Sequence, residues 1–169
     1  MIPCQRSLFS IPSDVVYLNT AYMSPLMTSV VDAVNYGAKL KATPWDITIS
    51  DFFENSELAR NLFADIVNVS SKNIALVPSA SYGLETAAKN LRVGNGRSVV
   101  ILENQFPSHV YPWQRLVKET GGKLIKVKEK QDRNLTELVL EFIDEKCAIV
   151  AVPNVLWTKG LILDLILIS

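Results

Sequence analysis

The chain has 169 residues, of which 49% are hydrophobic and 20% are charged, a composition that supports one sizeable core and leaves little for a second. Its 17 basic and 17 acidic side chains give a formal net charge of zero, so neither nucleic acid nor an anionic membrane surface is expected as a partner. The partner predicted from the charge balance is a small molecule or another protein.

The first 55 residues differ in pattern from the rest of the chain. The stretch "VYLNTAYMSPL" predicts a short extended piece that ends at Pro25, and a helix-like segment follows over residues 27–42. A turn at "TPW" then leads to an acidic segment with aromatic residues over residues 46–54. We therefore predict an amino-terminal arm and lead-in helices over residues 1–55.

Helix-like and strand-like patterns alternate from residue 56 onward. Apolar residues recur at helical spacing over residues 55–69, a short apolar run follows over residues 74–80, and residues 81–91 are again helix-like. This part of the chain is expected to form a helix, a strand and a second helix.

Further strands are predicted over residues 98–104, 123–129 and 147–155. The helices between them are expected over residues 113–122, where two glycines end the pattern, and over residues 134–146, where Asn134 is a suitable N-cap. In the second of these helices Leu135, Leu138 and Phe142 are predicted to face inward. The last strand is apolar throughout, as in a strand buried on both faces.

This alternation predicts an α/β fold with a mostly parallel sheet and flanking helices. In such sheets ligands bind beyond the carboxyl ends of the strands, which here read "PSAS", "ENQF" and "PNVL". The first of these ends opens a helix, whose free N–H groups and dipole suit an anion such as phosphate. A serine-rich turn is also what a plain N-cap requires, so a purely capping role stays open.

Four segments, in order, resemble the amino-terminal part of class V aminotransferase-like enzymes: "YLNTAYMSPL", "LVPSASYGLETAAKNL", "ENQFPSHVYPWQ" and "AIVAVPNVLWTKGLILDL". This group of pyridoxal-phosphate enzymes includes cysteine desulfurases, selenocysteine lyases, kynureninases and isopenicillin N epimerase. The resemblance implies a partial fold-type I large domain over residues 56–169, preceded by the arm, with pyridoxal phosphate as the cofactor.

The resemblance also implies a role for four residues in cofactor binding. Ala80 and Ser81 would bind the phosphate through backbone N–H groups and the Ser81 hydroxyl. Phe106 would stack on the pyridine ring, and Asn154 would form a hydrogen bond with the phenolic oxygen. Structural explanations stay open, since Phe106 suits a core position and Asn154 a strand-ending turn. His109, the only histidine, falls beyond the stacking position and is expected to be solvated or locally bonded at a helix start.

In this family the lysine that attaches the cofactor and the aspartate that binds its pyridine nitrogen both lie downstream of the asparagine strand. Lys159 is more typical of a loop lysine, and Asp164 is not at the aspartate position. We therefore expect an amino-terminal fragment holding half of a cofactor site, without covalent attachment, a catalytic residue or a metal site of its own.

The full-length enzyme is expected to be a homodimer that acts on a small-molecule amino acid by desulfuration, transamination, epimerisation or elimination. Two alternatives stay open. The chain could be a non-catalytic remnant that binds phosphate or cofactor, or a dimerisation partner of a full-length relative, and it could be an unrelated α/β binding domain.

The two cysteines favour a reducing compartment. Cys4 and Cys147 lie far apart, neither has metal-ligand spacing, and neither stands out as a persulfide carrier. The first residues lack a continuous apolar segment, and no apolar run approaches the roughly 20 residues of a membrane helix. A cytoplasmic protein with no membrane partner is expected.

Overall fold

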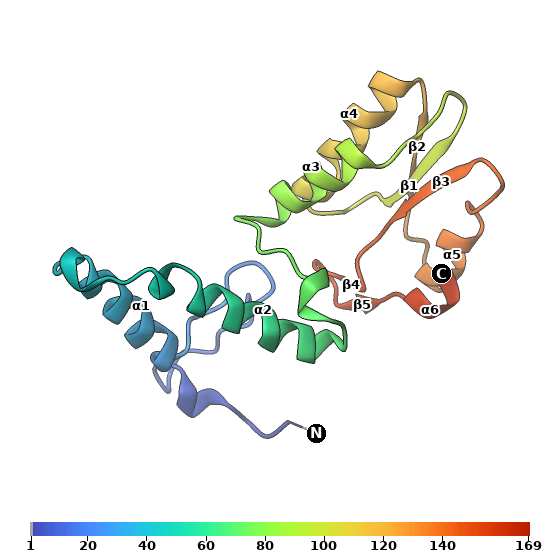
Figure 1. The fold of residues 1–169 in the computed structure, drawn as a ribbon. Helices are drawn as coiled ribbons and strands as arrows, with labels where there is room; N and C mark the ends of the chain where they lie inside the picture. Colours follow the sequence, from blue (N-terminus) through green and yellow to red (C-terminus); the bar gives the residue numbers. More distant parts are fainter. Residues whose placement is uncertain (1) are drawn as a thin grey trace. The chain divides into compact units, whose positions relative to one another are not determined.

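The computed structural model describes residues 2–169 and groups the chain into two compact units, one reaching to Leu76 and one spanning Val77–Ser169 (Figure 1). The sequence-based division lies at residue 55, whereas helix α2 (Glu54–Val67) belongs to the first compact unit. Where the cofactor-binding domain begins stays a prediction. No helix within residues 2–169 is both long enough and apolar enough to cross a membrane.

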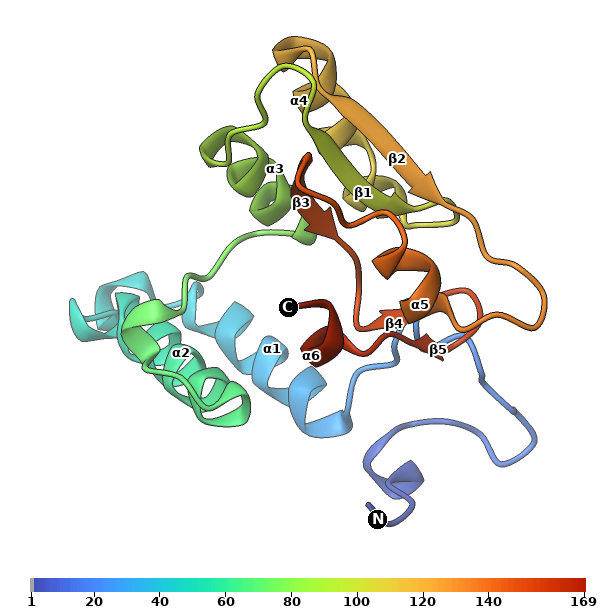
Figure 2. The same ribbon diagram turned by 90° about the vertical axis from the view of Figure 1, so that its right-hand side faces the viewer.

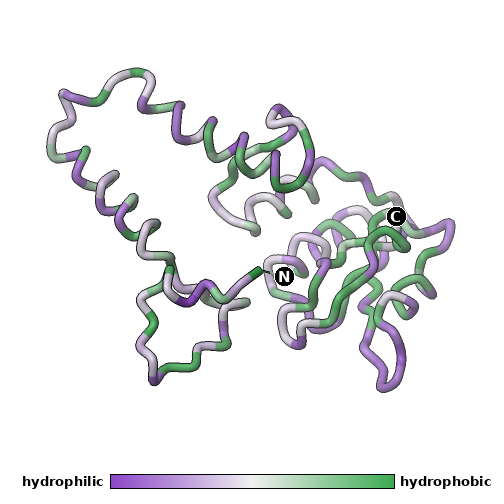
Figure 3. The backbone as a smooth tube through the Cα atoms, turned by 90° about the horizontal axis from the view of Figure 1, so that it is seen from below, coloured by the Kyte–Doolittle hydropathy of each residue, from purple (hydrophilic) through white to green (hydrophobic). Residues whose placement is uncertain are grey.

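The first unit is built on two amphipathic helices, α1 (Thr28–Leu40) and α2, which confirm the helices predicted over residues 27–42 and 55–69. Polar and apolar residues alternate along both helices (Figure 3). Of the described residues up to Leu76, only Ala64 is buried, so most apolar side chains of this unit face solvent. Its short 3-10 helices are η1 (Arg6–Leu8), η2 (Pro44–Asp46), η3 (Ser50–Phe52) and η4 (Ser71–Asn73).

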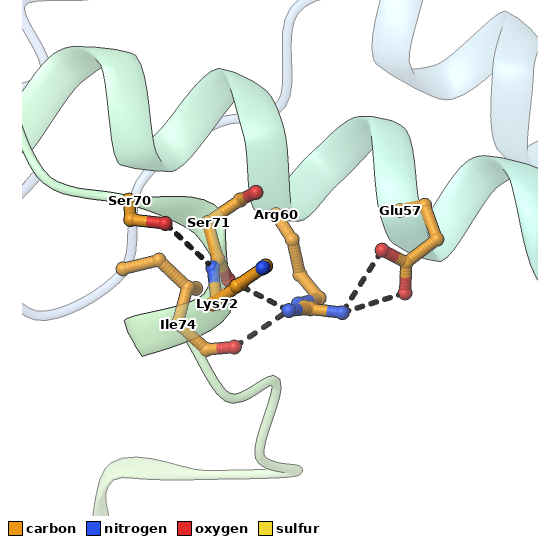
Figure 4. Close-up of polar contacts among 6 residues, drawn as sticks. All are labelled: Glu57, Arg60, Ser70, Ser71, Lys72 and Ile74. Atoms are coloured by element: carbon orange, nitrogen blue, oxygen red, sulfur yellow. Dashed lines mark hydrogen bonds and ion pairs between the residues drawn. The ribbon is translucent and has the colours of Figure 1, made fainter.

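Arg60 ties α2 to the segment that follows it (Figure 4). Its Nε donates to the carbonyl of Ile74 at 3.0 Å and its Nη2 to the carbonyl of Ser71 at 2.6 Å. Nη1 donates to both carboxylate oxygens of Glu57, at 2.7 and 2.9 Å. The planar guanidinium therefore fixes the connection after α2 through backbone atoms, which a lysine could not match in geometry.

The prediction of a strand over residues 74–80 is wrong. Residues 74–79 belong to no strand, and helix α3 (Ala80–Asn90) begins at the end of this range. The apolar pattern reports a tendency toward extended backbone, but a strand also requires a hydrogen-bonded neighbour. No described strand pairs with this segment.

The second unit contains a three-stranded parallel sheet in the order β2-β1-β3, which confirms the α/β class (Figure 1). The strands are β1 (Ser98–Leu102), β2 (Lys123–Val127) and β3 (Cys147–Ala151). Helix α4 (Tyr111–Thr120) connects β1 to β2, and α5 (Leu135–Leu140) connects β2 to β3, as parallel pairing requires. The last elements are η5 (Pro107–His109) after β1, the antiparallel hairpin of β4 (Val155–Leu156) with β5 (Leu161–Ile162), and α6 (Leu165–Ile168).

Strand β1 is buried along its whole length because helices cover both faces of the sheet. Val99 and Ile101 point into a cluster with α3 and α4, whereas Val100 and Leu102 point into a cluster with α5 and the hairpin. This is the two-residue alternation of a strand. Figure 2 shows α3 and α4 on one side of the sheet and α5 on the other.

Two details differ from the predictions for this unit. Helix α5 ends at Leu140 rather than near residue 146, so Phe142 lies beyond it and is exposed, while Leu135 and Leu138 are buried as expected. Strand β3 is an edge strand in which only Ala151 is buried. Residues of β3 pack against both core clusters, but the edge position leaves the strand only partly buried, which a continuous apolar sequence does not reveal.

Candidate functional site

The first predicted site element is the start of α3. Ser79 is the N-cap residue, with extended backbone, and its Oγ accepts the N–H of Tyr82 at 3.1 Å. Ala80 and Ser81 are the first helical residues, whose N–H groups have no acceptor within the helix. The capping role therefore belongs to Ser79, and it leaves two N–H groups and the Ser81 hydroxyl for a ligand.

A pocket of about 590 Å³ opens at this helix start. Its lining comes from α3, η5 and α4 and consists of Ser79, Ser81, Tyr82, Glu85, Ser108, Tyr111, Pro112 and Arg115. Glu85 is the acidic residue of the lining, and it is paired with both Arg115 and Lys89. The hydrogen bond that Arg115 donates to the Glu85 carboxylate raises the pKa of the Arg115 guanidinium above its usual value. The paired cations offset the carboxylate charge that would otherwise oppose an anion in this pocket.

Phe106 lies just past β1, as its place in the sequence predicts. The residue is 41% exposed, which contradicts the explanation that Phe106 is a core residue. Its backbone N–H donates to Oε1 of Gln105 at 2.8 Å. The ring contacts Trp157 edge to face, with ring centroids 5.3 Å apart and planes at 80°. Phe106 thus presents a partly open aromatic surface at the carboxyl edge of the sheet.

Asn154 lies past the end of β3, where it opens the hairpin. Its Nδ2 donates to the carbonyl of Leu163 at 3.1 Å, and its own carbonyl accepts the N–H of Leu163 at 2.8 Å. Asn154 is therefore a turn residue at the end of a strand, as the structural explanation predicted. A primary amide has two N–H donors, so one remains for a ligand oxygen.

The carboxyl ends of β1 and β3 are joined through the hairpin turn. Trp157 contacts Phe106 and donates from Nε1 to the carbonyl of Asn104 at 3.3 Å. Ser81 belongs to a pocket that includes neither Phe106 nor Asn154. The family resemblance also implies that Ser81, Phe106 and Asn154 converge on one cleft at the carboxyl edge of the sheet, and this stays a prediction. Trp157 was not among the residues predicted from the sequence, although an aromatic residue shortly after "PNV" is a visible signal.

Two further side chains from the sequence analysis are locally engaged. His109 Nδ1 accepts the indole N–H of Trp113 at 3.3 Å, which confirms the expectation of a locally bonded histidine. Lys159 donates to both carboxylate oxygens of Glu129, at 2.9 and 3.0 Å. Lys159 is therefore occupied by an ion pair at the sheet edge.

Comparison with known proteins settles the family. A sequence model described as "Aminotransferase class-V" matches residues 16–168. The chain belongs to the class V aminotransferase family. Similar class V proteins include a probable cysteine desulfurase of Mycoplasma pneumoniae, 27% identical over 95 residues, which cover 55% of this chain and 23% of the relative. A kynureninase of Geobacillus thermodenitrificans is 27% identical over 132 residues, which cover 74% of this chain and 31% of the relative.

The fold of the chain is also that of a solved protein with a PLP cofactor. A solved C-DES mutant, with glycine covalently linked to its PLP cofactor, superposes with a TM-score of 0.79 at 18% identity, covering 96% of this chain and 44% of that one. The chain spans less than half the length of each of these three proteins. Pyridoxal phosphate is the cofactor of this family, and the partial fold-type I architecture is confirmed.

The residues present at the α3 start fit a phosphate group. Two N–H groups without intrahelical acceptors and a serine hydroxyl lie at the positive end of a helix dipole. Ser81 lines a pocket there, and the nearby carboxylate is neutralised by ion pairs. This chemistry suits an anionic group held by backbone donors.

Proposed function

We propose that this chain forms the phosphate-binding part of a pyridoxal-phosphate enzyme that acts on an amino acid. The observation that carries the proposal is the α3 start, where Ser79 caps the helix and leaves the Ala80 and Ser81 donors free beside a pocket. Membership of the class V family makes pyridoxal phosphate the ligand expected there.

The proposed roles of the residues follow from their chemistry. The N–H groups of Ala80 and Ser81 and the Ser81 hydroxyl hold the phosphate, Phe106 covers one face of the ring and excludes water from it, and the free N–H of Asn154 binds the phenolic oxygen. These last two positions follow β1 and β3, at the edge of a parallel sheet where ligands bind. When bound, the cofactor supplies an electron sink for reactions at the substrate carbon next to the amino group.

The reaction of the whole protein is a further proposal. The relatives include proteins named cysteine desulfurase and kynureninase, so we favour an amino acid substrate whose side chain is cleaved or altered. Incubating the full-length protein with L-cysteine and with L-kynurenine, and measuring sulfide and anthranilate, separates the two activities. Absence of both products would redirect the search to transamination or epimerisation.

The homodimer expected from the family also stays a proposal. The apolar side chains of α1 and α2 are largely exposed in the first unit, and exposed apolar surface of this kind favours association. Sedimentation equilibrium of the full-length protein gives the oligomeric state directly, and a monomer at all concentrations would contradict the proposal.

The phosphate site is tested by titrating the chain with pyridoxal phosphate and following the quenching of tryptophan emission. Ser81→Asp should weaken binding about tenfold, because its carboxylate repels the phosphate at the helix start and the hydroxyl donor is lost. Aspartate is well tolerated at helix starts, so the fold should persist.

A matched control is Ser70→Asp, which places the same charge at the N-cap of η4 in the first unit. Its affinity should equal that of the parent chain. If Ser81→Asp binds as tightly as this control while remaining folded, the phosphate does not lie at the α3 start.

A further inference from the structure

Trp157 makes two contacts with the segment that follows β1. Its ring packs edge to face against the Phe106 ring, with ring centroids 5.3 Å apart. Its Nε1 donates to the carbonyl of Asn104 at 3.3 Å. The indole is therefore held by a polar contact at one point and meets the phenyl ring at another. Edge-to-face pairs have a preferred orientation, so this contact restricts the plane of the Phe106 ring.

The turn that carries Trp157 is itself anchored. Leu156 and Leu163, on either side of it, are buried in the core cluster shared with α5. The N–H groups of Lys159 and Gly160 donate to the carbonyl of Leu156 at 3.3 and 2.8 Å. The Lys159 side chain is paired with Glu129, next to the end of β2. The backbone of the turn that carries Trp157 is therefore fixed, and the indole is also held by its hydrogen bond to Asn104. Both rings are partly exposed, Trp157 at 38% and Phe106 at 41%, so the Phe106 ring has Trp157 as its aromatic neighbour on an anchored turn.

We propose that Trp157 is a positioning residue that sets the plane of the Phe106 ring for stacking on the cofactor, an inference that rests on the proposed function. A ring already held in the stacking plane loses less conformational freedom on binding than one free to rotate about its side-chain bonds. Trp157 acts only through Phe106, and its loss leaves the phosphate donors of the α3 start intact.

The test compares Trp157→Leu with Trp157→Phe. Leucine fills much of the space without an aromatic ring, whereas phenylalanine keeps a ring and loses only the Nε1 hydrogen bond. Trp45→Leu is the control, since Trp45 lies in the first unit and is 77% exposed. Far-ultraviolet circular dichroism and the emission of buried Trp113 check that each variant is folded.

The first measurement needs no cofactor. The chain is labelled with 4-fluorophenylalanine at its 6 phenylalanines, and the Phe106 resonance is assigned through Phe106→Leu. In Trp157→Leu this resonance should move toward the free amino acid value and narrow. It should stay displaced in Trp157→Phe and be unchanged in Trp45→Leu. An unchanged Phe106 resonance in Trp157→Leu would overturn the proposal.

The second measurement is the dissociation constant for pyridoxal phosphate, followed by cofactor absorbance. Trp157→Leu should lose about three- to tenfold in affinity, and Trp157→Phe should remain within about twofold of the parent. Equal losses in both variants, or none in Trp157→Leu, would refute the positioning role. Absence of saturable binding by the parent chain would refute the proposed function and with it this role, and the parent titration alone identifies that outcome.

Discussion

Replacing Gly122 with alanine tests the packing of the turn between α4 and β2 against the segment that connects α3 to β1. A Cβ at this position would lie 2.8 Å from Cγ1 of Val93 and 3.1 Å from the backbone oxygen of Arg97. Favourable carbon contacts begin near 3.5 Å, so the first distance is an overlap. The backbone cannot simply move away, because Gly122 N–H donates to the Val117 carbonyl at 3.0 Å and Val93 is itself buried. The expected loss is about 1–3 kcal/mol, typical of overpacking in a core.

Urea denaturation followed by the emission of Trp113 measures this loss, since Trp113 belongs to the same core cluster. With a slope of about 1–3 kcal/mol per molar urea, the midpoint should fall by about 1 M. Gly94→Ala is the matched control, because its Cβ would meet only the Arg97 side chain, at 3.8 Å, and its effect should stay within about 0.5 kcal/mol. Equal midpoints for the two variants would refute the packing argument.

Three further outcomes are expected. Arg60→Lys should speed amide hydrogen exchange over residues 70–74, because lysine cannot reproduce the fork of hydrogen bonds to two carbonyls, and unchanged exchange measured by mass spectrometry would contradict this. Burial raises the pKa of the Cys147 thiol, so iodoacetamide at pH 8 should modify exposed Cys4 first, and equal rates would contradict the assignment. Borohydride treatment of the chain with pyridoxal phosphate should fix no single lysine, since Lys159 is paired with Glu129. Stoichiometric labelling of Lys159 on peptide mapping would show the opposite.

Elements with strong local signals were predicted well from the sequence. The glycine pair after α4 marks a true helix end, since Gly121 adopts a backbone φ of +71° there, and Asn134 caps α5 through Oδ1, which accepts the N–H of Thr136 at 2.8 Å. Strand β1 was predicted because a run of apolar residues suits a strand buried on both faces. Each of these signals acts within a few residues of the chain.

Predictions that depended on distant partners were less successful. The strand over residues 74–80 needed a neighbour that the described chain does not pair with it. Strand β3 contacts both core clusters but is an edge strand, so most of its residues are only partly buried. Phe142 was expected inside, but α5 ends before it. Apolar sequence shows that burial is favourable, whereas the geometry of the neighbours decides whether it occurs.

The candidate site likewise contains one part that follows from local sequence and one part that depends on distant residues. The proposed phosphate donors at Ala80 and Ser81 are backbone groups whose direction follows from the helix itself. A serine-rich turn before a helix pattern was therefore enough to predict an anion site there, and the family resemblance identified the two residues. The orientation of Phe106 cannot be obtained in this way, because it depends on Trp157 in a hairpin turn far along the chain. A phosphate site made of backbone donors therefore requires only a correctly placed helix start. Stacking by Phe106 requires that two loops, one after β1 and one between β4 and β5, keep a fixed position relative to each other. We expect substitutions in the β4–β5 turn to change ring stacking before they change phosphate binding.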